Sequence, residues 1–151
     1  MKSQRSVVDY ALARRATLAA LARGGASTLD VCDAHPDLLR AARHRGEPTD
    51  RLCPVCGRER LTHVTYVYGD ELGQYSGRVK STAEIEAMAG EHGEVRVYVV
   101  EVCRGCAWNH LYKSYVVGDG VPRTPPRRQR PDERRPDEQR DVERRVVEDE
   151  R

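Results

Sequence analysis

The chain has 151 residues, one third of them charged, and a formal net charge of +2 at pH 7. Its 26 basic and 24 acidic side chains nearly balance, so any contact with nucleic acid would need a local basic patch rather than a basic protein. No apolar run approaches the roughly 20 residues that span a bilayer, and the N-terminus lacks the apolar core of a signal peptide. We therefore expect a soluble, cytoplasmic protein with no membrane partner.

Three short helices are predicted at the start of the chain. Ser6 with Asp9 resembles a capping box, and Pro36 suits the first turn of the third helix. Three helices joined by tight turns could form a helix-turn-helix, but no cluster of base-reading side chains stands out on the third. We favour a helical cap over one face of the domain. The helices are expected over residues 6–22, 28–34 and 36–44, within a cap of residues 1–48.

Two cysteine pairs follow, each with two residues between its members. They are Cys53 with Cys56 and Cys103 with Cys106. This spacing lets a tight turn aim both sulfurs at one point, and two such turns supply the four thiolates of a tetrahedral zinc site. Zinc is therefore the expected cofactor. Disulfides, a redox-active pair and an iron site with four thiolates stay open as alternatives.

The residues around the two pairs differ. Pro54 fixes its own backbone angle at the entry of the first turn, and Gly57 can adopt the left-handed conformation that such a turn often needs after its second cysteine. In the second pair the glycine comes earlier, at Gly105, and Ala107 follows Cys106. The second turn thus departs from the most regular form of a zinc knuckle.

A small antiparallel sheet is predicted to carry the cysteine pairs. One strand alternates in polarity, and a second, β-branched run leads directly into Cys103. Ser81 and Glu84 form a capping box that opens a short helix ending near Glu91, and this insertion explains the long gap between the pairs. The fold class expected is α+β, a three-helix cap on a three-stranded antiparallel zinc ribbon over residues 49–118. The strands are expected at residues 61–68, 94–102 and 111–117.

The chain changes character from residue 119 onward. Residues 119–151 contain ten arginines, ten acidic residues and five prolines, with almost no apolar side chains. Such a segment cannot bury enough apolar surface to fold alone. Residues 119–151 are therefore expected to form a disordered, mixed-charge tail; the alternative is a tether that folds on a partner.

Three further residues have competing interpretations. Trp108 could stack on a base or fill a pocket of a partner, or it could pack against the second knuckle and the cap. His110 could replace a cysteine as a ligand, although four cysteines already complete the site. Cys32 is unpaired, and we expect a buried thiol on the apolar side of the second helix rather than a reactive sensor.

The densest basic stretch surrounds the end of the third helix and the first cysteine pair. It could bind phosphates, or it could consist of ordinary solvated arginines near a helix end, where positive charge is favourable. The candidate binding surface consists of Arg40, Arg43, Arg45, Arg58, Arg60 and Trp108.

Five further observations are the segments RSVVDYALARRATL, VCDAHPDLLRAARHRG, CPVCG, YVYGDELGQYSG and VYVVEVCRGCAWNHLYKSYVVG. In combination they resemble an actinobacterial family of small, uncharacterised zinc-ribbon proteins. They cover most of residues 5–118, and the tail is not part of the resemblance. The family is a domain of unknown function, so the resemblance supports the domain bounds and the cytoplasmic location but implies no activity and no catalytic residue.

No catalytic constellation is found in the sequence, and a zinc ion with four cysteine ligands has no open coordination position. We expect no enzyme and no small-molecule substrate. The leading hypothesis is a non-enzymatic zinc-ribbon binding module, an accessory factor of transcription or translation that contacts nucleic acid or its machinery. The alternative is a protein–protein adaptor without nucleic-acid contact. A thiol redox protein is a third hypothesis, disfavoured because the thioredoxin-like βαβ context is missing.

Overall fold

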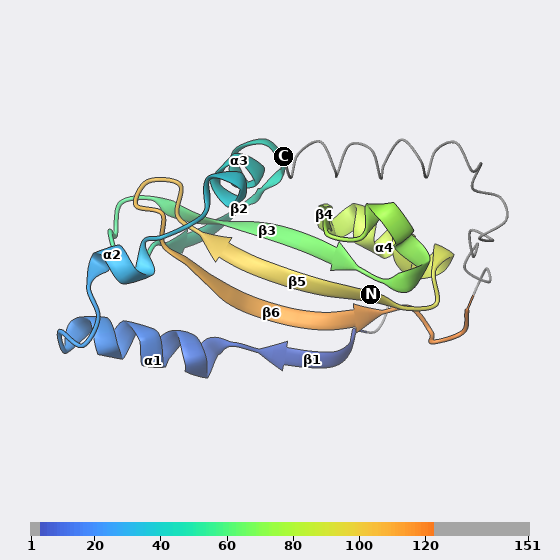
Figure 1. Cartoon of the computed structure of the whole chain (residues 1–151), viewed down its shortest axis with the longest axis horizontal. Helices are drawn as coiled ribbons and strands as arrows, with labels where there is room; N and C mark the ends of the chain where they lie inside the picture. The colour runs from blue at the N-terminus through green and yellow to red at the C-terminus, as the bar shows by residue number, and fades with distance from the viewer. Residues whose placement is uncertain (1–3, 123–151) are drawn as a thin grey trace, which may run out of the picture.

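All strands that the structure describes belong to one antiparallel sheet. The computed structural model describes residues 4–122, and its sheet has six strands in the order β1-β6-β5-β3-β2, with β4 paired to β3 (Figure 1). Neighbouring strands are antiparallel in every pair. The strands are β1 (Arg5–Asp9), β2 (Glu47–Leu52), β3 (Arg60–Tyr68), β4 (Arg78–Val79), β5 (Val95–Val102) and β6 (Asn109–Val117).

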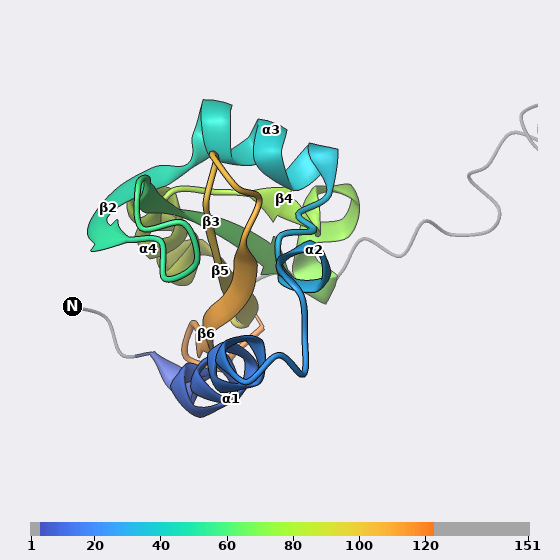
Figure 2. The ribbon, with the colours of Figure 1, turned by 90° about the vertical axis from the view of Figure 1, so that its left-hand side faces the viewer.

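Helices pack on both faces of this sheet, because successive side chains of a strand point to opposite faces. Ala42 packs with Val64 on one face, whereas Ile85 packs with Val67 on the other. Figure 2 shows α1 and α3 on opposite sides of the sheet. The helices are α1 (Ala11–Ala22), α2 (Thr28–Val31), α3 (Pro36–Arg45) and α4 (Thr82–Glu91), with a 3-10 helix, η1 (Asp70–Tyr75).

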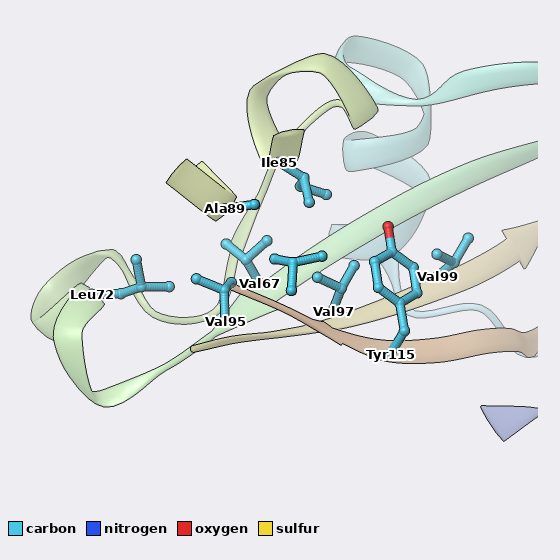
Figure 3. Packing of buried hydrophobic residues seen from close by; sticks show 9 residues of the cluster. Val67, Leu72, Ile85, Ala89, Val95, Val97, Val99 and Tyr115 are labelled. Atoms are coloured by element: carbon cyan, nitrogen blue, oxygen red, sulfur yellow. The ribbon is translucent and has the colours of Figure 1, made fainter. Parts of the chain in front are cut away.

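The largest hydrophobic cluster lies between α4 and the central strands (Figure 3). β3 pairs with β5 without a shift in register, from Thr62 opposite Val102 to Tyr68 opposite Arg96. Valines dominate the cluster because β-branched side chains fit a pleated, buried surface. Its buried members are Val67, Leu72, Ile85, Ala89, Val95, Val97, Val99, Tyr115 and Val117.

The predicted α+β class, with helices and an antiparallel sheet, is confirmed. Five of the elements predicted from the sequence are also confirmed, namely α3, α4, β3, β5 and β6. The start of α4 is the clearest case. The backbone N–H of Glu84 donates to Ser81 Oγ at 3.2 Å, and the backbone N–H of Ser81 donates to Glu84 Oε1 at 3.2 Å. The capping box read from the sequence therefore forms.

The helix expected over residues 6–22 is wrong at its N-terminal end. β1 occupies residues 5–9 and pairs with β6, so pairing with a distant strand overrides the local helical pattern. Ser6 has φ of 50° at an irregularity in this pairing and caps no helix. Asp9 Oδ1 instead accepts a hydrogen bond from the backbone N–H of Ala11 at 2.8 Å, at the first residue of α1.

The expected three-helix cap on a three-stranded ribbon is also wrong, because the sheet has six strands. β1 and β2 add an edge strand on each side, and the short β4 pairs with β3. β2 is charged and contains Pro48, a residue that sheets tolerate on an edge strand, so the sequence gives little sign of it. The expected boundary between residues 48 and 49 falls within β2.

Most of the expected tail, residues 123–151, lies outside the described residues. Within residues 4–122, no helix has both the length and the apolar character needed to cross a membrane.

Candidate metal centre

Two hairpins deliver the cysteine pairs to one end of the sheet. Cys53 follows β2 directly, and Cys103 follows β5 directly. The chain then turns and continues as β3 or β6. Because β3 pairs with β5 at Thr62 and Val102, the two turns lie side by side at the same end.

The two turns share a backbone hydrogen bond and an N–H contact to the first sulfur. In the first knuckle, the turn that holds Cys53 and Cys56, the N–H of Gly57 donates to the carbonyl of Cys53 at 3.0 Å. In the second knuckle, the turn that holds Cys103 and Cys106, the N–H of Ala107 donates to the carbonyl of Cys103 at 3.0 Å. In each knuckle a backbone N–H also points at the first sulfur, that of Val55 toward Cys53 and that of Cys106 toward Cys103, both at 3.4 Å. The knuckles are therefore built alike despite their different sequences.

The residue after each second cysteine is left-handed. Gly57 has φ of 64° and Ala107 has φ of 69°. A left-handed conformation costs a residue with a Cβ roughly 1–2 kcal/mol, so Ala107 is held there against its own preference. The backbone N–H of Ala34, from the segment after α2, donates to the carbonyl of Ala107 at 3.0 Å and helps to hold it.

The four sulfur atoms of Cys53, Cys56, Cys103 and Cys106 lie within 4.8 Å of one another and could hold a metal ion. The Sγ atoms of Cys53 and Cys106 are 3.6 Å apart, and those of Cys56 and Cys103 are 3.7 Å apart. A tetrahedron with Zn–S bonds of about 2.3 Å has edges of about 3.8 Å. The sulfur positions thus fit a tetrahedral metal ion, and the donor set suits zinc or iron.

The surroundings of the four thiols shift their pKa values in different directions. Backbone N–H groups of Arg58 and Glu59 stabilise the thiolate of Cys56 and lower its pKa to about 6. Burial raises the pKa of Cys106 to about 12. A bound cation would favour the thiolate form of both groups, because metal ligation requires deprotonated sulfur.

A hydrophobic cluster packs directly behind the cysteines. Trp108 is fully buried there, together with Leu61 and Val31, and α1 contributes Leu18 and Leu21 to its margin. The metal site would therefore be part of a small core of its own, separate from the valine-rich cluster under α4.

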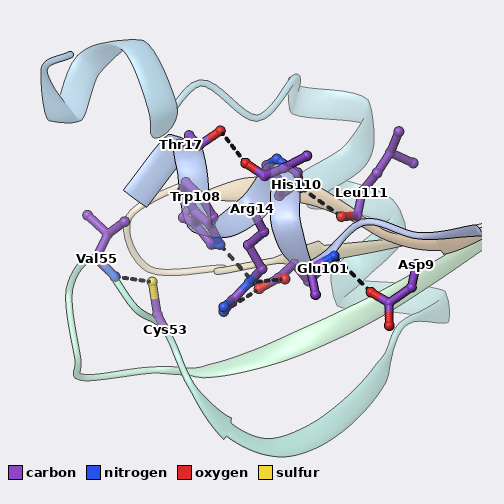
Figure 4. A network of polar contacts seen from close by, with 11 residues as sticks. Asp9, Arg14, Thr17, Cys53, Val55, Glu101, Trp108, His110 and Leu111 are labelled. Atoms are coloured by element: carbon purple, nitrogen blue, oxygen red, sulfur yellow. Dashed lines mark hydrogen bonds and ion pairs between the residues drawn. The ribbon is translucent and has the colours of Figure 1, made fainter. Parts of the chain in front are cut away.

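A buried carboxylate links this core to α1 (Figure 4). Glu101 is 1% exposed and lies on β5, two residues before Cys103. Arg14 of α1 donates to both of its oxygens, the second at 3.2 Å, and Trp108 Nε1 donates to Oε2 at 3.3 Å. Sequence reasoning missed this network, because Arg14 and Glu101 are 87 residues apart and neither belongs to a motif.

Trp108 does not belong to an exposed surface, contrary to its inclusion in the candidate binding surface. Its side chain has no solvent exposure, which corresponds to the alternative that it packs on the knuckle. His110 stacks on Trp108 with ring centroids 5.9 Å apart, and its Nδ1 lies 2.7 Å from the carbonyl of Leu111. His110 is not a member of the four-sulfur group.

Cys32 lies beside the candidate metal centre. It follows α2 immediately, is partly exposed rather than buried, and has its Sγ 3.7 Å from that of Cys106. Its sequence position, 21 residues before Cys53 and outside any CxxC pair, gives no sign of this contact.

The five candidate arginines are all exposed, but they form two groups at opposite ends of β2. Arg40, Arg43 and Arg45 lie on α3, before β2, whereas Arg58 and Arg60 follow the first knuckle. β2 separates the groups, because it pairs Glu47 with His63 near α3 and Leu52 with Arg60 near the first knuckle, with an irregularity in the register between them.

Ion pairs engage some of these arginines. Arg40 pairs with Asp37, Arg45 with Glu84 and Arg60 with Asp50. Among the residues that the structure describes, the side chains of Arg43 and Arg58 form no ion pair. These two are the members of the candidate surface whose charges are available for a partner.

Fold and site together define an α+β protein with a four-cysteine cluster that could hold a metal ion. The chain belongs to the family of unknown function DUF5318, whose model matches residues 1–131. It is 48% identical over 120 residues to uncharacterized protein Mb0050 of Mycobacterium bovis and to uncharacterized proteins MT0055 and Rv0049 of Mycobacterium tuberculosis. Each match covers 80% of this chain and 88% of the relative.

These matches confirm the resemblance to an uncharacterised actinobacterial family. No solved structure matches the chain significantly. The family match extends to residue 131, nine residues beyond the described part of the chain.

Proposed function

We propose that the protein is a non-enzymatic zinc-ribbon binding module, an accessory factor of transcription or translation that contacts nucleic acid or its machinery. The observation that carries this proposal is the four-sulfur group on two knuckles of matching geometry. Four thiolates fill the coordination sphere of zinc, so the ion would stabilise the fold and leave no position for a substrate. A reducing cytoplasm would keep these thiols available for the metal.

The proposed contact with nucleic acid rests on exposed arginines beside the metal centre. Arg58 follows the first knuckle, Arg104 lies within the second, and both are exposed. Arg43 adds a charge on α3 that is not engaged in an ion pair within the described chain. Phosphate contacts of this kind release counterions, so binding would weaken steeply as salt increases.

A salt-dependent binding assay tests this form of the proposal. The zinc-loaded chain is titrated against short RNA and duplex DNA at two salt concentrations. Arg43→Glu with Arg58→Glu should weaken binding and reduce the slope of log affinity against log salt by roughly 0.7–0.9 for each lost contact. The control is Arg78→Glu with Arg96→Glu, the same charge change at the far end of β3 and β5.

Two results would contradict the nucleic-acid form. The first is no binding of RNA or DNA by the wild-type chain even at low salt. The second is an equal loss of binding in both double variants, because that would indicate attraction by net charge and not by this surface.

A second candidate function, a protein–protein adaptor without nucleic-acid contact, is favoured by the edge strand β1. Val7 and Val8 are 51% and 46% exposed, and Leu12, in the first turn of α1, is 76% exposed. The other edge strand, β2, has Pro48 and charged residues that discourage pairing. An extended segment of a partner protein could add to β1 as a further strand.

This adaptor form has its own test, a pull-down from native lysate with wild-type chain and with Val8→Lys. A charge on this edge should abolish capture of the partner while the zinc content stays unchanged, and Leu29→Lys, a change at an exposed leucine on α2 away from this edge, should not. Capture that survives Val8→Lys would contradict the use of β1.

A further inference from the structure

A fifth sulfur is fixed against the second knuckle. Cys32 Sγ lies 3.7 Å from Cys106 Sγ, in the orientation of a thiol that donates to the knuckle sulfur. Two hydrogen bonds hold the segment that follows Cys32 in place: Ala34 N–H to the carbonyl of Ala107 at 3.0 Å, and Asn109 Nδ2 to Asp33 Oδ1 at 2.9 Å. Cys32 is thus positioned beside a candidate ligand while it stands outside the four-sulfur group.

Exposure singles out this pair from the other sulfur contacts. Three sulfur pairs in the described chain lie at hydrogen-bond distance: Cys32 with Cys106, Cys53 with Cys106, and Cys56 with Cys103. Cys53 is 2% exposed and Cys103 is fully buried, so each of the other two contacts includes a sulfur that solvent does not reach. Cys32 and Cys106 are both partly exposed.

A bound metal would further distinguish the pair of Cys32 and Cys106 from the other two sulfur pairs. With an ion bound, Cys53, Cys56, Cys103 and Cys106 would all be ligands, and a disulfide between two ligands would require both sulfurs to leave the metal. Cys32 would stay a free thiol in contact with a ligand. Its sulfur needs to approach that of Cys106 by only about 1.7 Å to reach the disulfide bond length of about 2.05 Å.

We infer that Cys32 and Cys106 form an oxidisable pair that a hydroperoxide converts to a disulfide, and that this reaction removes one ligand from the metal site. The loss of a metal ligand depends on the proposed zinc site. The formation of the disulfide depends only on the contact between the two sulfurs.

The reaction needs one hydroperoxide as the oxidant and proceeds in two steps. One sulfur attacks a peroxide oxygen, an S–O bond forms, the O–O bond breaks, and the departing oxygen leaves as water from hydrogen peroxide or as an alcohol from an organic hydroperoxide. The other sulfur then attacks the sulfenic sulfur, an S–S bond forms, the S–O bond breaks, and water leaves. The two sulfurs lose two electrons to the peroxide. One proton comes from the Cys32 thiol and one from solvent when Cys106 starts as a bound thiolate.

The product has a weakened metal site. A disulfide sulfur carries no charge and does not replace a thiolate, so three thiolates would remain around the ion. Zinc should therefore leave the oxidised chain more readily than the reduced one. Because Cys32 is not a ligand, its replacement should leave the loading of the reduced protein intact.

The test uses the full-length, zinc-loaded chain with hydrogen peroxide as the probe. Zinc release is followed with a metallochromic dye, and the first disulfide is located by peptide mass spectrometry. The wild-type chain should lose two hydrogens, show a bond between Cys32 and Cys106, and release zinc. Cys32→Ser should bind zinc equally well before treatment and release it several-fold more slowly.

Cys32→Ala serves as a second variant, because it also removes the S–H donor without introducing a hydroxyl. Zinc release at the wild-type rate in both variants would overturn the inference, and so would a first disulfide between Cys53 and Cys106 or between Cys56 and Cys103. An untreated wild-type chain without zinc would contradict the proposed metal site instead, and the disulfide map would then still decide the pairing.

Discussion

Glu101 is the charged residue that is buried in the described part of the chain. A carboxylate with almost no solvent exposure loses its hydration, and it is tolerated only when charge and hydrogen bonds replace the lost water. Arg14 supplies the charge and Trp108 supplies an indole N–H. This arrangement ties α1 to the strand that leads into Cys103.

Arg14→Met should destabilise the fold by about 3–5 kcal/mol, because it leaves the charge of Glu101 buried without a partner. Arg15→Met is the matched control, since the neighbouring arginine is exposed and its loss should cost no more than about 0.5 kcal/mol. Urea denaturation of both variants measures the difference. Adding Glu101→Gln to Arg14→Met should recover part of the loss. Equal stabilities of the two arginine variants would show that the network contributes little.

His63 gives the fold a dependence on pH. It is half-buried on β3, with its ring 4.6 Å from that of Tyr112. Burial lowers its pKa below the ordinary 6.5, Glu101 opposes the shift, and Arg51 adds to it. The imidazole of His63 therefore binds a proton more readily in the unfolded chain than in the folded chain. Its contribution to stability is present above pH 6.5 and is lost as pH falls through the lower pKa of the folded state.

His63→Gln should consequently reduce the loss of melting temperature between about pH 8 and pH 5. Thermal melts of the two proteins at the same zinc concentration isolate this difference from acid loss of the metal. His44→Gln, at an exposed histidine of α3, should melt with the wild-type pH dependence. A His63→Gln curve parallel to that of the wild type would contradict the assigned role.

At the scale of elements, the junction between α3 and β2 depends on a glycine for space and not for its backbone angle. Gly46 has φ of −77°, which any residue can adopt. A Cβ at this position, however, would lie 2.5 Å from the carbonyl oxygen of Ala42 and closer still to the methyl group of Thr62. Because Gly46 has no Cβ, α3 can pack closely against β3 at this junction.

Gly46→Ala should therefore cost about 1–3 kcal/mol, the range for overpacking a well-filled site. Gly25→Ala is the control, because its Cβ would meet only Ala20 O at 3.6 Å, an ordinary contact. Thermal or urea unfolding distinguishes the two. A neutral Gly46→Ala variant would mean that α3 can shift away from β3 without loss.

Local signals in the sequence predict some elements and miss others for physical reasons. α4 could be predicted from its capping box, and β5 from its run of β-branched residues, because each signal acts within a few residues. β1 could not, since its strand conformation comes from pairing with β6, more than 100 residues away. α2 is shorter than expected and ends at Val31, where the chain leaves the helix toward the second knuckle.

At the scale of the whole molecule, the four-cysteine site was predictable because metal ligation constrains spacing so strongly. The two CxxC pairs name the same four residues that the structure brings together. The contact of Cys32 with Cys106, the burial of Trp108 and the separation of the arginines into two groups depend on packing between distant segments, which no local pattern encodes.

Residues 4–122 form three buried clusters, and one of them consists largely of the cysteines and Trp108. A bound metal would join the two hairpins through that cluster. Structural zinc contributes about 10–16 kcal/mol of apparent binding free energy in small domains, comparable to the whole stability of a typical domain at about 5–15 kcal/mol. Removal of the metal should therefore unfold at least the knuckle end of the sheet.

Native mass spectrometry of the purified, reduced chain tests this central claim most directly. It should show one zinc ion per chain, with the mass of the adduct distinguishing zinc from iron. Cys56→Ser should lose the ion together with the compact charge-state distribution of the folded protein. A wild-type chain that is folded and metal-free, or a Cys56→Ser chain that keeps both its fold and one zinc ion, would contradict the account.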